Sequence, residues 1–173
     1  CIFNTIAVAA EHALNKRNLN RVLIVDWDVH HGNGTMHTFY ESASVLYISI
    51  HQFPHYPGTG RISDIGADEG EGYTVSLPLP PGCGDADYDY VFKNIVVPVA
   101  DEYAPELVLV SAGCDPDKRD PLAGMELTSP MFGRMTDYLV AVAADHASDR
   151  IGVVLEGGYD LQALENGVHA TIE

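Results

Sequence analysis

Three side chains that can bind a metal ion stand at alternate positions after a short apolar run. The run covers residues 22–25, and Asp26, Asp28 and His30 follow it. A short, β-branched run is typical of a strand buried on both faces, and alternation along that strand predicts that all three side chains point to one side. A divalent cation is the simplest way to stabilise two carboxylates and an imidazole in a dry site. The alternative interpretation is a solvated strand end with His30 in a loop.

Two further apolar runs end in residues that can take part in the same chemistry. Asp115 follows one run, and Gly157-Gly158-Tyr159 follows another. Ligands of α/β sheets bind beyond the carboxyl ends of the strands, so these residues are expected near Asp28 and His30. Asp28, His30 and Asp115 would supply three N/O ligands and leave positions open for water and substrate, as in catalytic zinc sites.

This combination favours metal-assisted hydrolysis of an amide or ester. A metal ion polarises a carbonyl group and lowers the pKa of a bound water. Tyr159, after two flexible glycines, can donate its hydroxyl to an oxyanion. The alternative for Tyr159 is a packed aromatic ring whose hydroxyl has found a polar partner.

The chain pattern predicts an α/β fold with a mostly parallel sheet, because apolar runs alternate with segments of helical periodicity. The expected strands cover residues 22–25, 45–50, 73–79, 106–111 and 151–155. The expected helices cover residues 4–14, 34–41, 85–103, 129–146 and 161–173. Asn4 or Thr5 is expected to cap the first helix, and Pro98 to kink the third. The prolines near the end of strand 73–79 place it at a sheet edge.

Composition bounds the class of protein. The 173 residues suffice for one domain and carry a net charge of −16, with 25 acidic and 9 basic side chains. This charge argues against nucleic-acid binding, which needs a basic footprint. It suits cationic partners, or serves solubility alone. Three widely spaced cysteines fit a reducing, cytoplasmic (intracellular) location. No apolar run is long enough for a transmembrane helix, so no membrane partner is expected.

Several longer motifs resemble those of the zinc-dependent histone deacetylase family, in its class II branch and the bacterial amidohydrolase relatives. The motifs cover residues 26–35, 111–115 with 120–122, 156–159, 56–60 and 1–4. Asn33 stands where class I members have aspartate. The resemblance implies an arginase/deacetylase-like three-layer α/β fold with a mostly parallel sheet.

The resemblance also implies roles for individual residues. Asp28, His30 and Asp115 would bind one zinc ion, with iron(II) as an alternative. Tyr159 would stabilise the tetrahedral intermediate, while Asp26 and Asn33 would orient two tandem histidines. The implied ligands of one structural potassium ion are Asp26, Asp28, His30, Ser49 and Ile50, and those of a second, more peripheral one are Phe39, Ser42, Val45 and Tyr73. The implied substrate-binding residues of the acyl-lysine tunnel are Tyr56 and Gly158.

One departure from the family pattern concerns the general base. In the family the tandem histidines lie upstream of the segment that begins here at Cys1, and His30 is used as a ligand. His31 is therefore expected to be structural. The remaining histidines without a matching role are expected to be surface or packing residues: His12, His37, His55, His146 and His169. We expect residues 1–173 to be a single, N-terminally truncated catalytic domain that is nearly inactive alone.

The substrate stays open at the level of sequence. Acetyl-lysine in proteins, acetylated polyamines and other short acyl amides all suit a narrow tunnel with a metal ion at its base. Two other interpretations remain: a ureohydrolase-like enzyme with two metal ions, and an inactive metal-binding homologue. The oligomeric state is not readable from the sequence.

Overall fold

One parallel sheet organises the protein. The structure is a computed structural model that describes residues 3–173, so Cys1 and Ile2 of the motif at residues 1–4 lie outside the described residues. Within that range the sheet has the strand order β3-β2-β1-β4-β5, with all neighbours parallel. The strands are β1 (Val22–Asp26), β2 (Val45–Gln52), β3 (Thr74–Leu79), β4 (Leu107–Ala112) and β5 (Ile151–Leu155). The predicted α/β fold with a mostly parallel sheet is confirmed.

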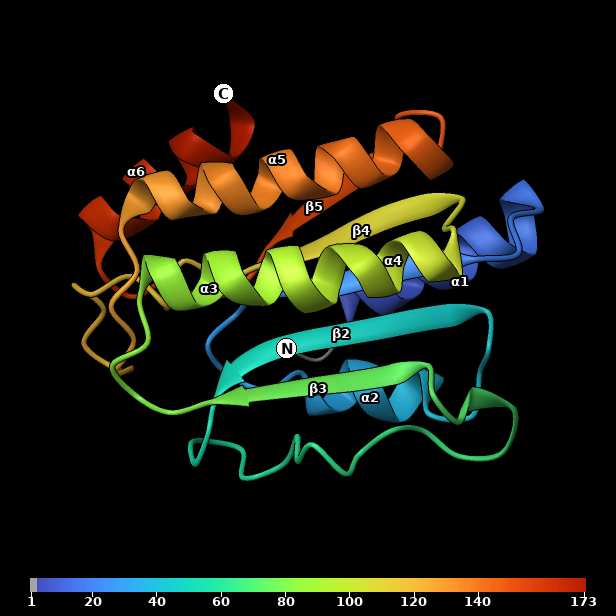
Figure 1. The fold of residues 1–173 in the computed structure, drawn as a ribbon, viewed down its shortest axis with the longest axis horizontal. Coiled ribbons are helices and arrows are strands. Elements are labelled where there is room, and N and C mark those ends of the chain that lie inside the picture. The colour runs from blue at the N-terminus through green and yellow to red at the C-terminus, as the bar shows by residue number, and fades with distance from the viewer. Residues whose placement is uncertain (1–2) are drawn as a thin grey trace.

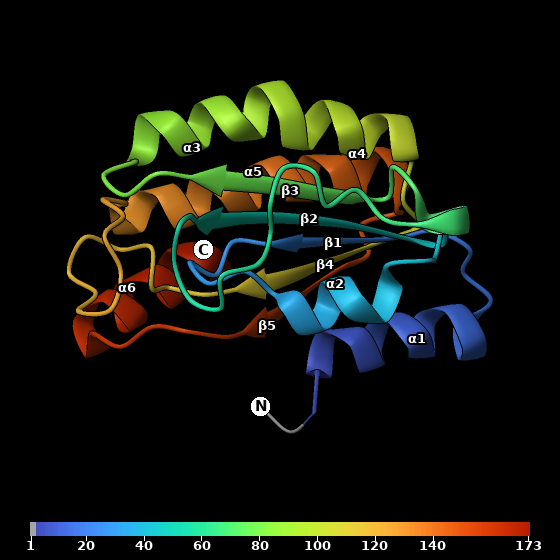
Figure 2. The same cartoon turned by 90° about the horizontal axis from the view of Figure 1, so that it is seen from below.

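Helices cover both faces of the sheet and complete three layers (Figure 1, Figure 2). One face carries α3 (Asp85–Val91), α4 (Val97–Tyr103) and α5 (Ser129–His146). The other face carries α1 (Thr5–Arg17) and α2 (Asn33–Phe39). The helix α6 (Leu161–Ile172) packs against α5.

The central strand β1 belongs to two hydrophobic cores at once. Leu23 and Val25 join the core beneath α3, α4 and α5, whereas Val22 and Ile24 join the core beneath α1 and α2. All five residues of β1 are buried. A strand covered on both faces needs apolar side chains at every position, which explains the continuous run at residues 22–25.

The first helix is longer than predicted. The Asn4 side chain accepts a hydrogen bond from the Ala7 amide (3.0 Å), which confirms Asn4 as the cap. The helix then runs to Arg17, three residues beyond the predicted end, and stops where Asn18 adopts a left-handed conformation (φ 56°). Two basic side chains in its last turn suit the negative end of the helix dipole.

The predicted single helix over residues 85–103 is interrupted ahead of Pro98. A π-helical turn, η2 (Phe92–Val96), separates α3 from α4, and the three run on in one line (Figure 1). Proline has no amide hydrogen to give to the preceding turn. Pro98 lies in the first turn of α4, directly after the π-helical turn, and the helical segments continue without a sharp kink (Figure 1).

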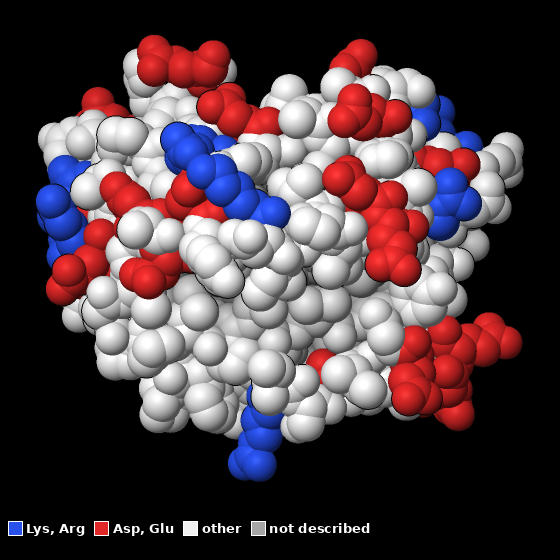
Figure 3. Space-filling model, in the orientation of Figure 1, with Lys and Arg blue, Asp and Glu red and all other residues white. Residues whose placement is uncertain are grey.

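The strand β3 lies at the edge of the sheet, as the sequence predicts from its prolines. In this strand, Pro78 lies opposite His51 of β2. The loop between β2 and β3 contains one short 3₁₀ turn, η1 (Asp68–Gly70). Figure 3 shows acidic side chains spread over the face that carries α3, α4 and α5. Among the described residues, no helix is both long and apolar enough to cross a membrane.

Candidate metal centre

The residues of the candidate site meet at the carboxyl ends of β1 and β4. These strands are neighbours, with Asp26 opposite Ser111. Asp28 and His30 lie in the loop that follows β1, and Asp115 lies in the loop that follows β4. The prediction that Asp26, Asp28 and His30 alternate along one strand is wrong, because β1 ends at Asp26 and the chain then bends.

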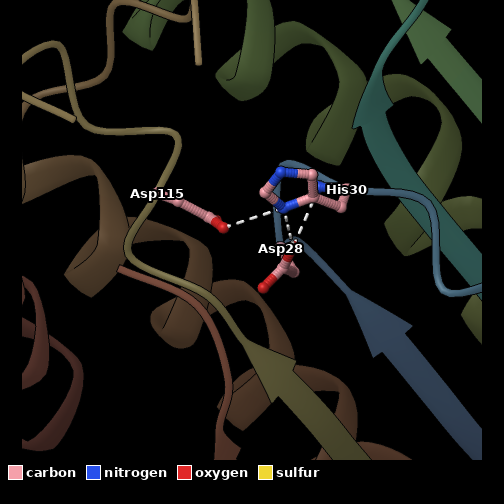
Figure 4. Close-up of side chains that lie close together, drawn as sticks. All are labelled: Asp28, His30 and Asp115. Carbon is pink, nitrogen blue, oxygen red and sulfur yellow. Dashed lines mark hydrogen bonds and ion pairs between the residues drawn. The ribbon is translucent and has the colours of Figure 1, made fainter. Parts of the chain in front are cut away.

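Asp28, His30 and Asp115 form a compact cluster (Figure 4). The Nδ1 atom of His30 lies 3.1 Å from Asp28 Oδ1 and 3.1 Å from Asp115 Oδ2. One ligand atom from each residue falls within 4.8 Å of the others. Asp115 is fully buried, while Asp28 and His30 are half-buried. The structure thus brings together the three residues predicted as ligands.

Backbone amides hold the two carboxylates in place. The Val29 amide donates to Asp115 Oδ1 (2.9 Å), and the Gly157 amide donates to Asp28 Oδ2 (2.8 Å). A Cβ atom at Gly157 would overlap the Asp115 carboxylate, and one at Gly113 would lie 2.6 Å from Asp28 Oδ2. Glycine at these two positions therefore lets the strand ends approach the carboxylates closely.

The electrostatics of the cluster fit a divalent cation. Burial raises the pKa of Asp115, and hydrogen bonds to Asp115 and Asp28 raise the pKa of His30 to about 10. Within residues 3–173, no Lys or Arg side chain pairs with either carboxylate. Two carboxylates on one imidazole, one of them fully buried, need a compensating positive charge, which a metal ion supplies in place of the imidazole proton. Two carboxylate oxygens and one imidazole nitrogen are suitable ligands for it.

Tyr159 stands beside the cluster. Its ring meets that of His30 edge-on, with centroids 6.4 Å apart, and its side chain is 53% exposed. The preceding Gly158 has a φ of +144°, which glycine adopts readily, and the Gly157 carbonyl accepts the Cys114 amide (2.7 Å). Burial raises the pKa of Tyr159, so the hydroxyl stays protonated and able to donate.

A cavity of about 430 Å³ opens beside the cluster and is lined by Asp26, Asn33 and Glu156 among others. Asp26 is buried, and its carboxylate accepts the Tyr47 hydroxyl (2.8 Å) and the Asp28 amide (3.1 Å). Asn33 begins α2 and is exposed. Both residues predicted to support the chemistry thus lie on the wall of one cavity.

The loop after β2 lies against His30. The Tyr56 ring is 77% exposed and meets the His30 ring edge-on at 6.3 Å. The His55 ring stacks on His30 at 5.1 Å. His55 is thus a packing residue, within the surface or packing role expected for it, but its contact with His30 was not predicted. His146 pairs with Asp101 and His169 with Glu173, both away from the site.

His31 and His51 form a second pair of neighbouring imidazoles, next to the stacked rings of His30 and His55. His31 is buried and contacts His51 with ring centroids 4.7 Å apart. Its Nδ1 atom lies 2.7 Å from Thr59 Oγ1. His51 Nε2 donates to the Gly60 carbonyl (2.8 Å), so in the neutral ring Nδ1 accepts from the Ser49 hydroxyl (3.0 Å). This pair joins the end of β2 to the loop that carries Tyr56, and it agrees with the structural role predicted for His31.

The residues predicted as potassium ligands fall into two groups. Ser49 lies opposite Asp26 in the sheet, and Ile50 follows it in β2. Phe39, Ser42, Val45 and Tyr73 lie at the other end of the sheet, where α2 ends and β2 and β3 begin. The potassium sites stay predictions.

Sequence reasoning gave no role to Asp120, although it belongs to a quoted motif. Asp120 is 7% exposed, and its Oδ2 accepts the Tyr159 amide (2.8 Å). The signal available in the sequence was an aspartate five residues after the candidate ligand Asp115, but its partner Tyr159 is 39 residues away in the sequence.

Known proteins are similar to this chain over nearly its whole length. The sequence profile of the histone deacetylase domain matches residues 1–173. "Histone deacetylase 10, chloroplastic" of Oryza sativa subsp. japonica is 44% identical over 171 residues, which cover 99% of this chain and 39% of that protein. A "Probable deacetylase" of Archaeoglobus fulgidus is 43% identical over 162 residues, which cover 94% of this chain and 45% of that protein.

A solved structure has the same fold. The crystal structure of the HDA15 HD domain superposes with a TM-score of 0.93 at 42% identity, covering 99% of this chain and 48% of that one. This confirms the predicted deacetylase-type three-layer fold. The chain thus spans less than half the length of these relatives. One relative is named as chloroplastic, so the cytoplasmic location stays a prediction.

Proposed function

Because the chain belongs to the histone deacetylase family, we propose that it forms the metal-binding and tyrosine-bearing part of a catalytic domain that hydrolyses acyl-amide bonds. The observation that carries the proposal is the convergence of Asp28, His30 and Asp115 beside Tyr159. Loops from β1, β4 and β5 supply these residues, and no two of these loops adjoin in the sequence.

Asp28, His30 and Asp115 would hold one zinc ion, with iron(II) as the alternative for the same nitrogen and oxygen ligands. When bound, such an ion acts as a Lewis acid on the acyl carbonyl and lowers the pKa of the attacking water. The amides of Val29 and Gly157 fix the two carboxylates that would hold the ion. Potassium at the predicted site of Asp26, Asp28, His30, Ser49 and Ile50 would stabilise the loop that follows β1, whereas the second predicted potassium site lies at the other end of the sheet.

Tyr159 would donate its hydroxyl hydrogen to the carbonyl oxygen as negative charge develops there. Asp26 and Asn33, on the wall of the neighbouring cavity, would orient tandem histidines supplied by another part of the protein. Those histidines would act as general base and acid. Without them we expect the chain alone to be slower by about 10²–10⁴-fold.

The substrate class we propose is an acetylated lysine side chain in a protein. Tyr56 and Gly158 would contact its aliphatic stem, since the exposed Tyr56 ring meets the His30 ring edge-on. Acetylated polyamine is the second candidate, because the net charge of −16 attracts polycations over distance.

The test compares the full-length wild-type protein with the Asp115→Ala and Tyr159→Phe variants. We expect about one metal ion per wild-type chain and a strong loss in Asp115→Ala. Tyr159→Phe should keep its metal and lose about 10²–10³-fold in kcat, as oxyanion donors do. Metal content is measured by inductively coupled plasma emission spectroscopy. Activity is measured as deacetylation of an acetyl-lysine peptide. Two metal ions per chain would favour a ureohydrolase-like enzyme instead, and unchanged kcat in Tyr159→Phe would refute its assigned role.

A further inference from the structure

We propose that Asp120 is a positioning residue, which holds the backbone of Tyr159 so that its hydroxyl meets the reacting carbonyl. This inference rests on the proposed function, because it assumes that Tyr159 is the oxyanion donor. Asp120 does not touch the cluster of Asp28, His30 and Asp115 through any hydrogen bond that we find in residues 3–173. It acts through Tyr159 alone.

The Asp120 carboxylate is fixed at both oxygens. Oδ1 accepts the Leu122 amide (2.9 Å), and the Asp120 amide donates to the Asp117 carbonyl (2.8 Å), so the residue is locked within its own loop. Oδ2 reaches across to the segment after β5 and accepts the Tyr159 amide (2.8 Å). Asp120 as a whole is 7% exposed, so water does not compete freely for these bonds.

Tyr159 needs such an anchor because the residues before it are two glycines. Gly157 is held by Asp28 Oδ2 and the Cys114 amide, but Gly158 then leaves the backbone free to turn. The next fixed points are Tyr159, through Asp120, and Asp160, whose side chain caps α6 by accepting the Ala163 amide (2.7 Å). The Tyr159 side chain is 53% exposed, so packing alone does not fix it.

One loop therefore sets the distance between the metal ligands and the tyrosine. Asp115 and Asp120 are five residues apart in that loop, where Asp115 contacts His30 and Asp120 holds Tyr159. A misplacement of about 1 Å at a reacting group can cost about 10²-fold in rate. Loss of the Asp120 bond should thus reduce kcat while leaving metal binding intact.

The experiment uses Asp120→Asn in the full-length, metal-loaded protein. The amide keeps the shape of the side chain but replaces one acceptor oxygen with an NH₂ group, so one of the two amide donors loses its partner. Asp117→Asn is the matched control. Asp117 lies in the same loop and is buried, but its carboxylate bonds Arg119 (3.0 Å) and not the Tyr159 segment.

We expect Asp120→Asn to lower kcat by about ten- to a hundredfold with KM nearly unchanged, and to keep one metal ion per chain. In a Tyr159→Phe background the same change should alter kcat by less than about twofold, because the hydroxyl it positions is already absent. Asp117→Asn should keep kcat within about twofold of the wild type. Amide hydrogen exchange should be slow at Tyr159 in the wild type and faster in Asp120→Asn.

Three results would overturn the inference: an equal loss of kcat in both backgrounds, loss of metal from Asp120→Asn, or a wild-type Tyr159 amide that exchanges like one in an unfolded segment. The last needs no variant, so it decides even if Asp120→Asn fails to fold. If Tyr159→Phe alone keeps full kcat, the assigned role of Tyr159 fails. In that case, the hydrogen-exchange rate of the Tyr159 amide still tests whether Asp120 holds the backbone at Tyr159.

Discussion

His30 and His31 are neighbours in the sequence, yet their imidazoles lie in opposite surroundings. His30 faces two carboxylates, and hydrogen bonds to Asp115 and Asp28 raise its pKa to about 10. His31 is buried beside His51 and Thr59, and burial together with the His51 ring lowers its pKa to about 4. The surroundings of His30 therefore favour a protonated ring or a bound cation, whereas those of His31 favour the neutral ring.

The difference shows that residue type alone does not assign a role. The His30 imidazole lies in the cluster with Asp28 and Asp115 (Figure 4), whereas the next imidazole, His31, contacts His51 and Thr59. His30 belongs to the proposed metal site, and His31 with His51 joins β2 to the loop that carries Tyr56. Substitutions at His30 should affect metal binding most, and substitutions at His31 and its neighbours should affect the stability of the fold.

The largest effect is expected from His30→Ala. Removal of a ligand should weaken metal affinity by more than about 100-fold, the upper range for a residue that only supports a ligand. His31→Asn, the matched variant at the neighbouring position, should retain about one metal ion per chain. Titration of the metal-free proteins with zinc, followed by a competing chelator dye, measures both. Equal loss of affinity in the two variants would contradict the different roles assigned to His30 and His31.

His51 is expected to have an effect of intermediate size, on how the free energy of unfolding depends on pH. Burial lowers the pKa of His51, so the folded ring stays neutral while the unfolded chain takes up a proton near pH 6.5. This stability is fully present above about pH 6.5 and is lost as pH falls toward the folded pKa, by at most about 1.4 kcal/mol per pH unit. His31, whose pKa is also lowered, and Asp64 are the titratable groups that act on this ring.

The measurement is urea unfolding of the metal-free protein between pH 7 and 5. His51→Asn should show a shallower decline than the wild type. His12→Asn, at an exposed position of α1, should leave the slope unchanged. A wild-type slope equal to that of His51→Asn would mean that His51 is not held neutral in the folded protein.

The smallest effect is expected from Thr59→Val. This change removes the hydroxyl that lies 2.7 Å from His31 Nδ1 and should cost about 1 kcal/mol of unfolding free energy. Thr38→Val removes an exposed hydroxyl that bonds only its own helix and should cost less than about 0.5 kcal/mol. Thermal unfolding compares the two. Equal costs would show that the Thr59 bond to His31 adds no stability.

The sequence by itself determined the fold class and the types of residue at the site. Apolar runs such as residues 22–25 specify buried parallel strands because both faces of such a strand need apolar side chains. The polar residues that end these runs indicated one edge of the sheet, since parallel strands deliver their carboxyl ends together. These signals are local, so they can be read without coordinates.

Only the tertiary structure decided which of these residues meet. Asp115 reaches His30 because β4 pairs with β1, and Asp120 reaches Tyr159 because the loops after β4 and β5 adjoin. The stacking of His55 on His30 and the different surroundings of His30 and His31 depend on the path of two loops. Such contacts join residues far apart in the sequence, and their energies depend on burial and direction, which no local pattern contains.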